Sequence, residues 1–449
     1  MNIDPRETLS SAPMRALQVL AVAITVGLLA LDGFDVLSIS FAAPGIASEW
    51  GIARTQLGVV LSMELIGMAL GSIVLGGVAD RIGRRPTMLG CLVLMTIGMF
   101  MVTGVKQIAQ LEVWRFVTGL GIGGVLACTN AVAAEFSNLR RRSLCVSLMA
   151  VGYPVGAVCG GLIVKELLRD HDWRTVFYFG GSITALFIPL VLLLVPESVH
   201  WLAQKQPPDA LARINRALAR MGHAAIAALP SVPAVPAGAS RRSMSEIFAP
   251  ALIVTTLLAT LAYFFHIMTF YFILKWIPKI VFDMHFPASA AAGVLVWANV
   301  GGAAGGTLLG LLSQRFGLKP LTIGVMLLSV VMVTLFGRSS PDLNELSLLC
   351  AGAGFCTNAA VVGLYAIFAQ AFPTQVRATG TGFAIGIGRG GSVLGPITAG
   401  FLFERGYTLP TVALYMAMGS LCAAGVLALL RLKPDVSLPG VKQPVWLKS

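Results

Sequence analysis

Charged side chains are scarce in this sequence. Only 12% of its 449 residues are charged and 56% are hydrophobic, and the mean hydropathy is +0.83. Soluble globular domains carry about twice that share of charge, so the composition excludes a soluble fold. It also excludes a disordered chain, because disorder requires low hydrophobicity. The net charge of +12 indicates a nucleic-acid partner only if the basic residues gather on one surface.

Cysteine is also sparse, and the cysteines are not spaced as in metal sites or redox pairs. The seven cysteines are odd in number, and all lie inside apolar runs without a CxxC or Cys/His pattern. That arrangement excludes a disulfide-stapled domain and predicts neither a metal site nor a cofactor.

The first apolar run is too long for the core of a signal peptide. We therefore expect it to remain in the mature protein.

What the sequence does have is long apolar runs from end to end. A helix that crosses a bilayer needs roughly 20 mostly apolar residues. Twelve runs meet this requirement: 17–41, 55–79, 87–106, 109–135, 143–166, 174–195, 249–277, 288–313, 319–337, 343–371, 378–404 and 408–431. The predicted fold class is an all-α polytopic membrane protein with twelve transmembrane helices in a lipid bilayer.

The basic residues follow the topology of these spans. With twelve spans, both termini and the long polar segment 196–248 fall on one side, which collects 21 Lys and Arg residues against nine on the other. Lys275 is counted among the nine, and only Arg115 and Arg389 are left inside spans. Cytoplasmic loops carry the excess of Lys and Arg. We therefore expect both termini to be cytoplasmic, the membrane to be a bacterial-type inner membrane, and no nucleic acid to bind.

The two halves of the chain repeat each other. "GGVADRIGRRP" at 76–86 returns as "GLLSQRFGLKP" at 310–320, 234 residues later. The same shift superimposes two pairs of glycines: Gly67 on Gly301 and Gly71 on Gly305. Small residues four apart let helices approach closely, and paired repeats are typical of transporters whose halves rock against each other. The predicted domains are a six-helix half at 1–195, a central loop at 196–248, and a second half with a tail at 249–449.

The central loop has a pattern of its own. Four apolar residues recur at helical spacing: Leu211, Ile214, Leu218 and Met221. We expect an amphipathic helix there, lying on the cytoplasmic membrane surface. The stretch "PSVPAVPAG" at 230–238 is typical of a flexible tether between the halves.

The loop "GGVADRIGRRP" between spans two and three resembles the signature loop of the major facilitator superfamily. The twelve spans, the duplicated loop and the long central loop fit that family over nearly the whole chain. Four further stretches resemble its aromatic acid:proton symporters: "LDGFDVLSISFAAPGIASEWGI", "RFVTGLGIGG", "PTQVRATGTG" and "GIGRGG". The resemblance implies import of benzoate-type and hydroxybenzoate-type anions with protons. Two departures stand out. Gln314 replaces the Asp80 of the first half, and the proline of span five sits at Pro154 rather than in the Gly-Pro motif of antiporters.

Few charges lie at membrane depth, where each needs a partner or a function. Asp32, Asp35, Glu64 and Arg115 share one layer in the outer half of the spans. Three carboxyls near one guanidinium cannot all ionise cheaply, so we expect proton coupling, a role that the resemblance also gives to Asp32 and Asp35. The alternative is a fixed ion pair between an aspartate and Arg115, whose guanidinium could equally organise the bundle. Glu64 could be substrate-specific or merely hydrated.

Arg389 lies near the midplane of span eleven, with no acid within one turn of its own helix. Its planar fork matches a carboxylate, so we expect a small-molecule carboxylate as its partner, the alternative being a structural contact. Ring and amide side chains at similar depth are candidates for the rest of the substrate site: Phe34, Asn130, Tyr153, His266, Trp297, Asn299, Asn358 and Tyr365. Each of them singly is also typical of helix packing.

The resemblance further implies a salt-bridged gate at the cytoplasmic ends of the helices, closed in the outward-open state. The residues concerned are Asp80, Arg81, Arg84, Arg85, Glu135 and Arg142. The alternative for these residues is a solvated surface.

The function predicted from the sequence is a monomeric secondary transporter that imports a carboxylate by proton symport. The main alternative is proton-coupled efflux of a drug or metabolite on the same fold. A transport-like sensor would need a longer cytoplasmic domain than the central loop provides. An enzyme is not expected, because no nucleophile–base or metal spacing occurs.

Overall fold

The computed structural model describes residues 4–230, 244–313, 315–373 and 376–431, and every regular element among them is helical. Eleven helices are long and apolar enough to cross a membrane. They are α2 (Ala16–Trp50), α3 (Arg54–Ile82), α4 (Arg84–Thr103), α5 (Ile108–Glu135), α6 (Arg142–Asp170), α7 (Arg174–Leu194), α10 (Ile253–Asp283), α11 (Ala288–Leu312), α12 (Leu318–Gly337), α13 (Leu343–Ala371) and α16 (Leu409–Leu429). The membrane class expected from composition is confirmed.

The eleventh expected span is not one continuous helix. It consists of α14 (Arg377–Gly388) and α15 (Gly390–Glu404), which meet at Arg389. Glycine costs a helix interior about 1 kcal/mol relative to alanine, and the "GIGRGG" stretch holds four of them. A Cβ at Gly391 would lie 2.0 Å from the Phe264 carbonyl oxygen, so the break also brings this segment against α10. The expected count of twelve continuous helices is therefore not confirmed.

Glycines hold the paired helices of each half together. A Cβ at Gly67 of α3 would lie 2.2 Å from the Phe116 carbonyl oxygen of α5. Its counterpart Gly301 of α11 would meet the Ala351 carbonyl oxygen of α13 at 2.0 Å. The repeated glycines predicted from the sequence thus lie at equivalent close contacts between two helix backbones in each half.

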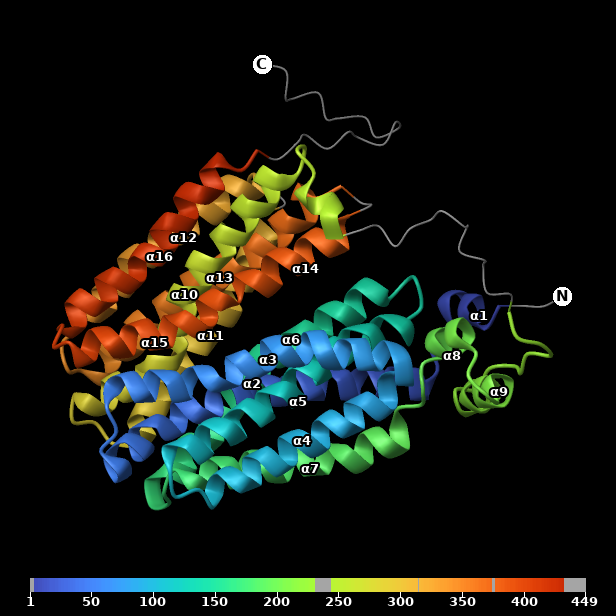
Figure 1. Ribbon diagram of the computed structural model, residues 1–449, viewed down its shortest axis with the longest axis horizontal. Coiled ribbons are helices and arrows are strands. Elements are labelled where there is room, and N and C mark those ends of the chain that lie inside the picture. Colours follow the sequence, from blue (N-terminus) through green and yellow to red (C-terminus); the bar gives the residue numbers. More distant parts are fainter. Residues whose placement is uncertain (1–3, 231–243, 314, 374–375, 432–449) are drawn as a thin grey trace.

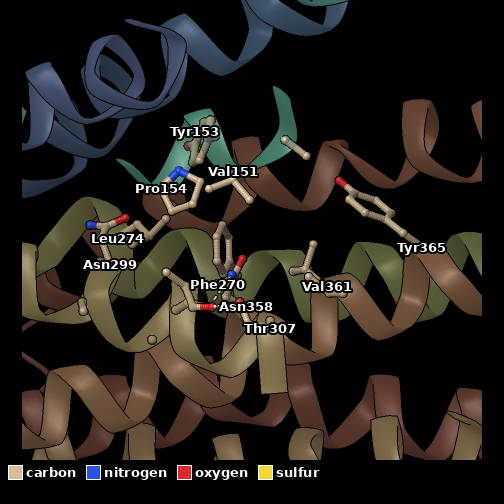
Figure 2. A pocket seen from close by; sticks show the side chains of 17 residues that line it. Val151, Tyr153, Pro154, Phe270, Leu274, Asn299, Thr307, Asn358, Val361 and Tyr365 are labelled. Atoms are coloured by element: carbon tan, nitrogen blue, oxygen red, sulfur yellow. Dashed lines mark hydrogen bonds between the residues drawn. The ribbon is translucent and has the colours of Figure 1, made fainter. Parts of the chain in front are cut away.

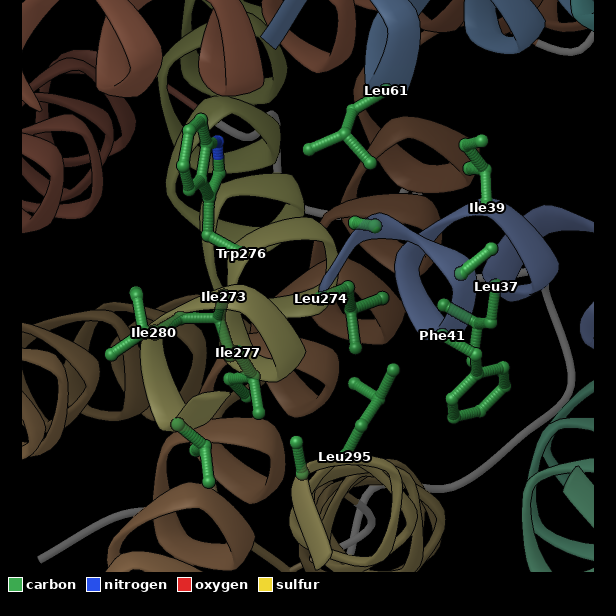
Figure 3. Packing of buried hydrophobic residues seen from close by; sticks show 14 of the residues in the cluster. Leu37, Ile39, Phe41, Leu61, Ile273, Leu274, Trp276, Ile277, Ile280 and Leu295 are labelled. Atoms are coloured by element: carbon green, nitrogen blue, oxygen red, sulfur yellow. The ribbon is translucent and has the colours of Figure 1, made fainter. Parts of the chain in front are cut away.

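The two halves lie side by side and close on each other at one end (Figure 1). There Arg54 at the start of α3 forms an ion pair with Asp283 at the end of α10, at 3.3 Å. The Thr55 backbone amide donates to Glu404 at the end of α15, at 2.9 Å. Apolar side chains of both halves form one core beside these contacts (Figure 3). The closed end lies away from the end that carries α1 (Pro5–Ser11).

The segment between α7 and α10 includes α8 (Val199–Lys205), α9 (Ala210–Arg220) and the short 3-10 helix η1 (Met244–Phe248). The helix α9 matches the expected amphipathic pattern, but its apolar face packs against protein and is not free to contact a membrane surface. Ile214, Leu218 and Met221 are at most 1% exposed and belong to the core of the N-terminal half. They are covered by protein because α8 packs against α9. Most of the expected tether at 230–238 lies outside the described residues.

Candidate functional site

The central cavity lies between the two halves. One part of it encloses about 500 Å³ and the other about 340 Å³. The two parts share Tyr153 of α6 with Asn358 and Tyr365 of α13, so they adjoin. Figure 2 shows the smaller part, where Tyr153 and Pro154 face Phe270 and Asn358 from the opposite half. Pockets of 300–1,000 Å³ suit single small molecules.

Arg389 lines the larger part of the cavity, at the point where α14 and α15 meet. Its guanidinium makes no hydrogen bond or ion pair with any residue that the structure describes. Asp32 of α2, only 3% exposed, lines the same space from the other half. The helix break explains this placement, because it puts the residue at a helix junction rather than inside a packed helix. The cavity therefore holds one unpaired cation and one carboxyl.

Tyrosines surround Arg389, and sequence reasoning missed two of them. Tyr263 and Tyr271 of α10 line the larger part of the cavity together with the expected Tyr365. The hydroxyls of Tyr263 and Tyr365 are 3.0 Å apart, and their rings stack with centroids 5.8 Å apart. The signal was present in the aromatic-rich stretch "YFFHIMTFYF" at 263–272. Stacked rings with a polar edge offer an apolar face and a hydrogen bond to the same ligand.

Three expected asparagines line the cavity. Asn130 and Asn299 each donate an amide hydrogen to a carbonyl of their own helix, at 3.0 and 2.9 Å. Asn358 donates across to the Gly302 carbonyl oxygen of α11, at 2.7 Å. Each amide retains an oxygen acceptor and a second N–H donor. These groups are suited to the hydroxyls of a bound ring.

Three other expected substrate contacts do not line the cavity in this structure. Phe34 is 3% exposed and packs edge-on against Phe179, with centroids 5.2 Å apart. His266 is fully buried between the Ser420 hydroxyl at 3.0 Å and the Thr357 carbonyl at 2.8 Å. Trp297 is 53% exposed and lines neither part of the cavity. In each case the helix carries the side chain away from the cavity.

The acid cluster forms, but with different partners than expected. Arg115 of α5 contacts Glu64 of α3 at 2.5 Å, and both side chains are fully buried. The guanidinium also donates to the Asp35 carbonyl oxygen at 3.2 Å. The expected Asp–Arg115 pair is thus replaced by a Glu64–Arg115 pair. Asp35 is fully buried beside it, and its two carboxyl oxygens have no hydrogen-bond partner among the described residues.

Lys275 of α10 completes this cluster, although the sequence placed it at the outer ends of the spans. Its side chain is fully buried, and its Nζ lies 3.5 Å from the Glu64 carboxylate. It also donates to the Val36 carbonyl oxygen of α2. The helix α10 continues to Asp283, well beyond the expected end at 277, so Lys275 lies about two turns inside it.

The expected cytoplasmic gate centres on Arg84. Its guanidinium pairs with Asp80 at 2.7 Å and with Glu135 at 3.7 Å. Its backbone amide donates to Glu197 at 2.9 Å, a residue of the "PESVHWL" motif that the expected gate omitted. Gly83 has φ +114 and passes so close to the Glu197 carboxylate that a Cβ would clash at 2.3 Å. These contacts join residues of the N-terminal half to one another and to the start of the central segment, and none of them reaches the C-terminal half.

The remaining gate residues make no ion pair with a described residue. Arg81 is exposed, Arg85 donates to the Leu192 carbonyl oxygen, and Arg142 lies near His200 of α8. Burial and the Arg142 guanidinium together lower the pKa of His200 below its usual value. The structure is closed at the opposite end, so these residues are not in contact with the C-terminal half.

Comparison with known proteins gives matches over almost the full chain. The family model described as Major Facilitator Superfamily matches residues 25–306 and 259–446. The chain is 29% identical to a gallate transporter of Pseudomonas putida, covering 97% of this chain and 98% of that protein. It is 29% identical to the 4-hydroxybenzoate transporter PcaK of Pseudomonas aeruginosa, with 95% of each covered. It is also 29% identical to a 3-(3-hydroxy-phenyl)propionate transporter of Escherichia coli, with 93% and 94% covered.

Solved structures give the same fold at lower identity. The inward-open xylose transporter XylE of E. coli has a TM-score of 0.72 at 18% identity, with 94% of this chain and 98% of that one covered. A bacterial homologue of the human lysosomal transporter Spinster, inward-facing and occupied, has a TM-score of 0.70 at 15% identity, with 93% and 97% covered.

Proposed function

The chain belongs to the major facilitator superfamily, whose members are membrane transporters rather than enzymes, and we propose that it imports an aromatic carboxylate by proton symport. Gallate, 4-hydroxybenzoate and 3-(3-hydroxyphenyl)propionate are named for the relatives, and each joins a carboxylate to a hydroxylated ring. We further propose a monomer in a bacterial inner membrane with both termini in the cytoplasm.

One observation carries the substrate class: the unpaired guanidinium of Arg389 in the cavity. A partly buried cation without a protein partner is costly, and a carboxylate ligand would satisfy it through two charge-assisted hydrogen bonds. The stacked Tyr263 and Tyr365 supply an apolar face for a ring. Asn130 and Asn358 supply hydrogen bonds for ring hydroxyls. The site thus matches each part of a hydroxybenzoate-type anion.

Proton coupling is proposed for Asp32, Asp35 and Glu64. Asp32 shares the cavity with Arg389, so a bound anion and the Asp32 carboxyl would be near neighbours. Protonating that carboxyl removes a negative charge beside the incoming anion. Proton and anion then favour each other's binding, as symport requires. In the proposed alternating access, we assign the closed end to the periplasmic side, and the Arg84 network would close the cytoplasmic side in the opposite state.

Efflux by proton antiport is the competing function on this fold, and the pH dependence of binding separates the two. Symport predicts that affinity tightens as pH falls from 8 to 5, measured with an anion that stays ionised across the range. Antiport predicts weaker binding at low pH, because proton and substrate compete for one site. Affinity that rises steadily with pH would replace the import proposal with efflux.

Counterflow in proteoliposomes tests the substrate class. Vesicles preloaded with unlabelled 4-hydroxybenzoate should take up labelled benzoate-type acids, and should ignore the methyl esters of the same acids. The ester is the matched control, since it keeps the ring and removes only the charge. Equal exchange of acid and ester, or exchange of sugars instead of aromatic acids, would contradict the proposal.

A further inference from the structure

Lys275 joins the two halves of the molecule at membrane depth. The helix α10 belongs to the C-terminal half, yet the Lys275 ammonium reaches the Glu64 carboxylate of α3 at 3.5 Å and the Val36 carbonyl oxygen of α2. Its side chain is fully buried. The neighbouring Trp276 is buried in the core at the closed end (Figure 3). This contact therefore joins the two halves at their closed end.

The charges in the cluster balance only with Lys275 in place. Asp35 and Glu64 supply two carboxyls from the N-terminal half, and Arg115 is the cation of that half. The remaining charged groups that face the cluster are Asp32, on the cavity side, and Arg389 beyond it. With Lys275 present, two cations can neutralise two ionised carboxylates. Without it, one negative charge is left in a low-dielectric site, which favours the binding of a proton.

We propose that Lys275 and the transported proton alternately neutralise the same carboxyls, so that closing the outer end expels the proton. When the halves part at that end, the ammonium withdraws with α10, and Asp35 or Glu64 takes a proton from outside. When the halves close, the ammonium returns and the proton leaves through Asp32. Asp32 lies three residues from Asp35 on the same helix face and lines the cavity. This inference rests on the proposed symport and gives Lys275 a coupling role within it.

Lys275→Met tests the role directly, because it keeps the length of the side chain and removes the charge. The closed state must then keep its proton, so accumulation driven by a proton gradient should fall to the level of no gradient, while counterflow without a gradient should persist. Lys275→Arg keeps a cation and should keep accumulation. The matched control is Lys279→Met, one turn further along α10, where the lysine pairs with Asp283 of the same helix. Lys275→Met that still accumulates substrate like the unmodified protein would overturn the proposal.

A second measurement needs no substrate and does not depend on transport by a Lys275 variant. The Ser62 side chain is fully buried, and its hydroxyl donates to the Val393 carbonyl oxygen of the other half at 2.8 Å. In Ser62→Cys, a membrane-impermeant maleimide added outside should react only when the outer end opens. Labelling should rise as external pH falls from 8 to 5, by up to about tenfold per pH unit, the limit for one linked proton. The pH dependence should vanish when Lys275→Met is added.

These outcomes separate the two proposals. Labelling of Ser62→Cys that does not change with pH overturns the role of Lys275, whatever the substrate proves to be. The role of Lys275 is also overturned if the labelling still depends on pH in the Lys275→Met background. Failure of aromatic acids in counterflow would instead contradict the proposed substrate, and it leaves the labelling test intact.

Discussion

The two halves of this protein share their helix packing but differ in the polar groups that they bury. Gly67 and Gly301 make the same close approach in repeated positions. The N-terminal half buries three carboxyls, Asp32, Asp35 and Glu64, with one arginine. The C-terminal half supplies Arg389, Lys275 and three tyrosines of the cavity: Tyr263, Tyr271 and Tyr365. The repeat thus preserves the backbone contacts, while the chemistry has been divided between the copies.

Under the proposed symport, this division separates the binding groups for the proton from those for the carboxylate. Carboxyls are the groups that bind protons, and a guanidinium is the group that binds a carboxylate. Placing them on opposite halves lets the relative movement of the halves change how the two sites interact. We expect substitutions of the buried carboxyls in the N-terminal half to alter coupling, and substitutions of Arg389 and Tyr365 in the C-terminal half to alter affinity. Lys275 is the exception in the C-terminal half, because it contacts those carboxyls.

The largest expected effect is at Arg389. Arg389→Ala removes a bidentate, charge-assisted contact worth about 3 kcal/mol, so the Kd of a benzoate-type acid should rise roughly 100-fold. Arg389→Lys should lose less, because it keeps the charge without the fork. Binding measured by scintillation proximity checks both, with Arg405→Ala at the closed end as control. If the alanine variant binds the acid as tightly as the unmodified protein, the carboxylate does not bind to Arg389.

Next is the loss of coupling at Asp35. A gradient of one pH unit drives about tenfold accumulation when one proton moves with one anion. In Asp35→Asn this ratio should fall to about one, while counterflow continues, because an amide cannot carry the proton. Uptake into vesicles with and without a pH gradient measures the ratio. Glu112→Gln, a neutralised acid of α5 outside the cluster, should accumulate normally. Full accumulation by Asp35→Asn would make Asp35 structural.

The smallest effect is expected from one hydroxyl of the tyrosine pair. Tyr365→Phe removes a neutral hydrogen-bonding group worth about 1 kcal/mol, so 4-hydroxybenzoate should bind roughly fivefold more weakly. Benzoate should bind as before, since its ring has no hydroxyl to recognise. Tyr407→Phe, at the closed end, serves as the control. An equal loss for both acids would mean that Tyr365 shapes the pocket and does not select the ring.

The depth of the key charges was predictable, but their pairing was not. Helices have a regular rise, so Asp35, Glu64 and Arg115 could be placed in one layer from the sequence. Glu64 pairs with Arg115 because α3 and α5 pack closely at Gly119. A Cβ at Gly119 would lie 2.2 Å from the Glu64 carbonyl oxygen. This close approach brings Glu64 to within one turn of Arg115 on the facing helix. No local pattern in either helix encodes that contact.

The position of Lys275 was predicted wrongly, because the end of its helix was placed too early. An apolar run that ends near a lysine is typically interpreted as a span that stops there, since lysines reach for water at such positions. In the structure α10 continues for two further turns, and the lysine turns inward to an acid of the other half. The partner that keeps the lysine buried is more than 200 residues away in the chain, so the sequence around Lys275 carries no sign of it.

By itself the sequence determined the membrane-spanning class, the duplicated halves and the layer in which the buried charges lie, because composition and helical rise are local properties. Only the tertiary structure decided which side chains face the cavity, since spanning helices are apolar on nearly every side and no hydrophobic face sets their rotation. Asn358 thus enters the site, while His266 and Trp297, at similar depth, face a packed core and the exterior. Close approach at the glycines and contacts between the halves fix those rotations.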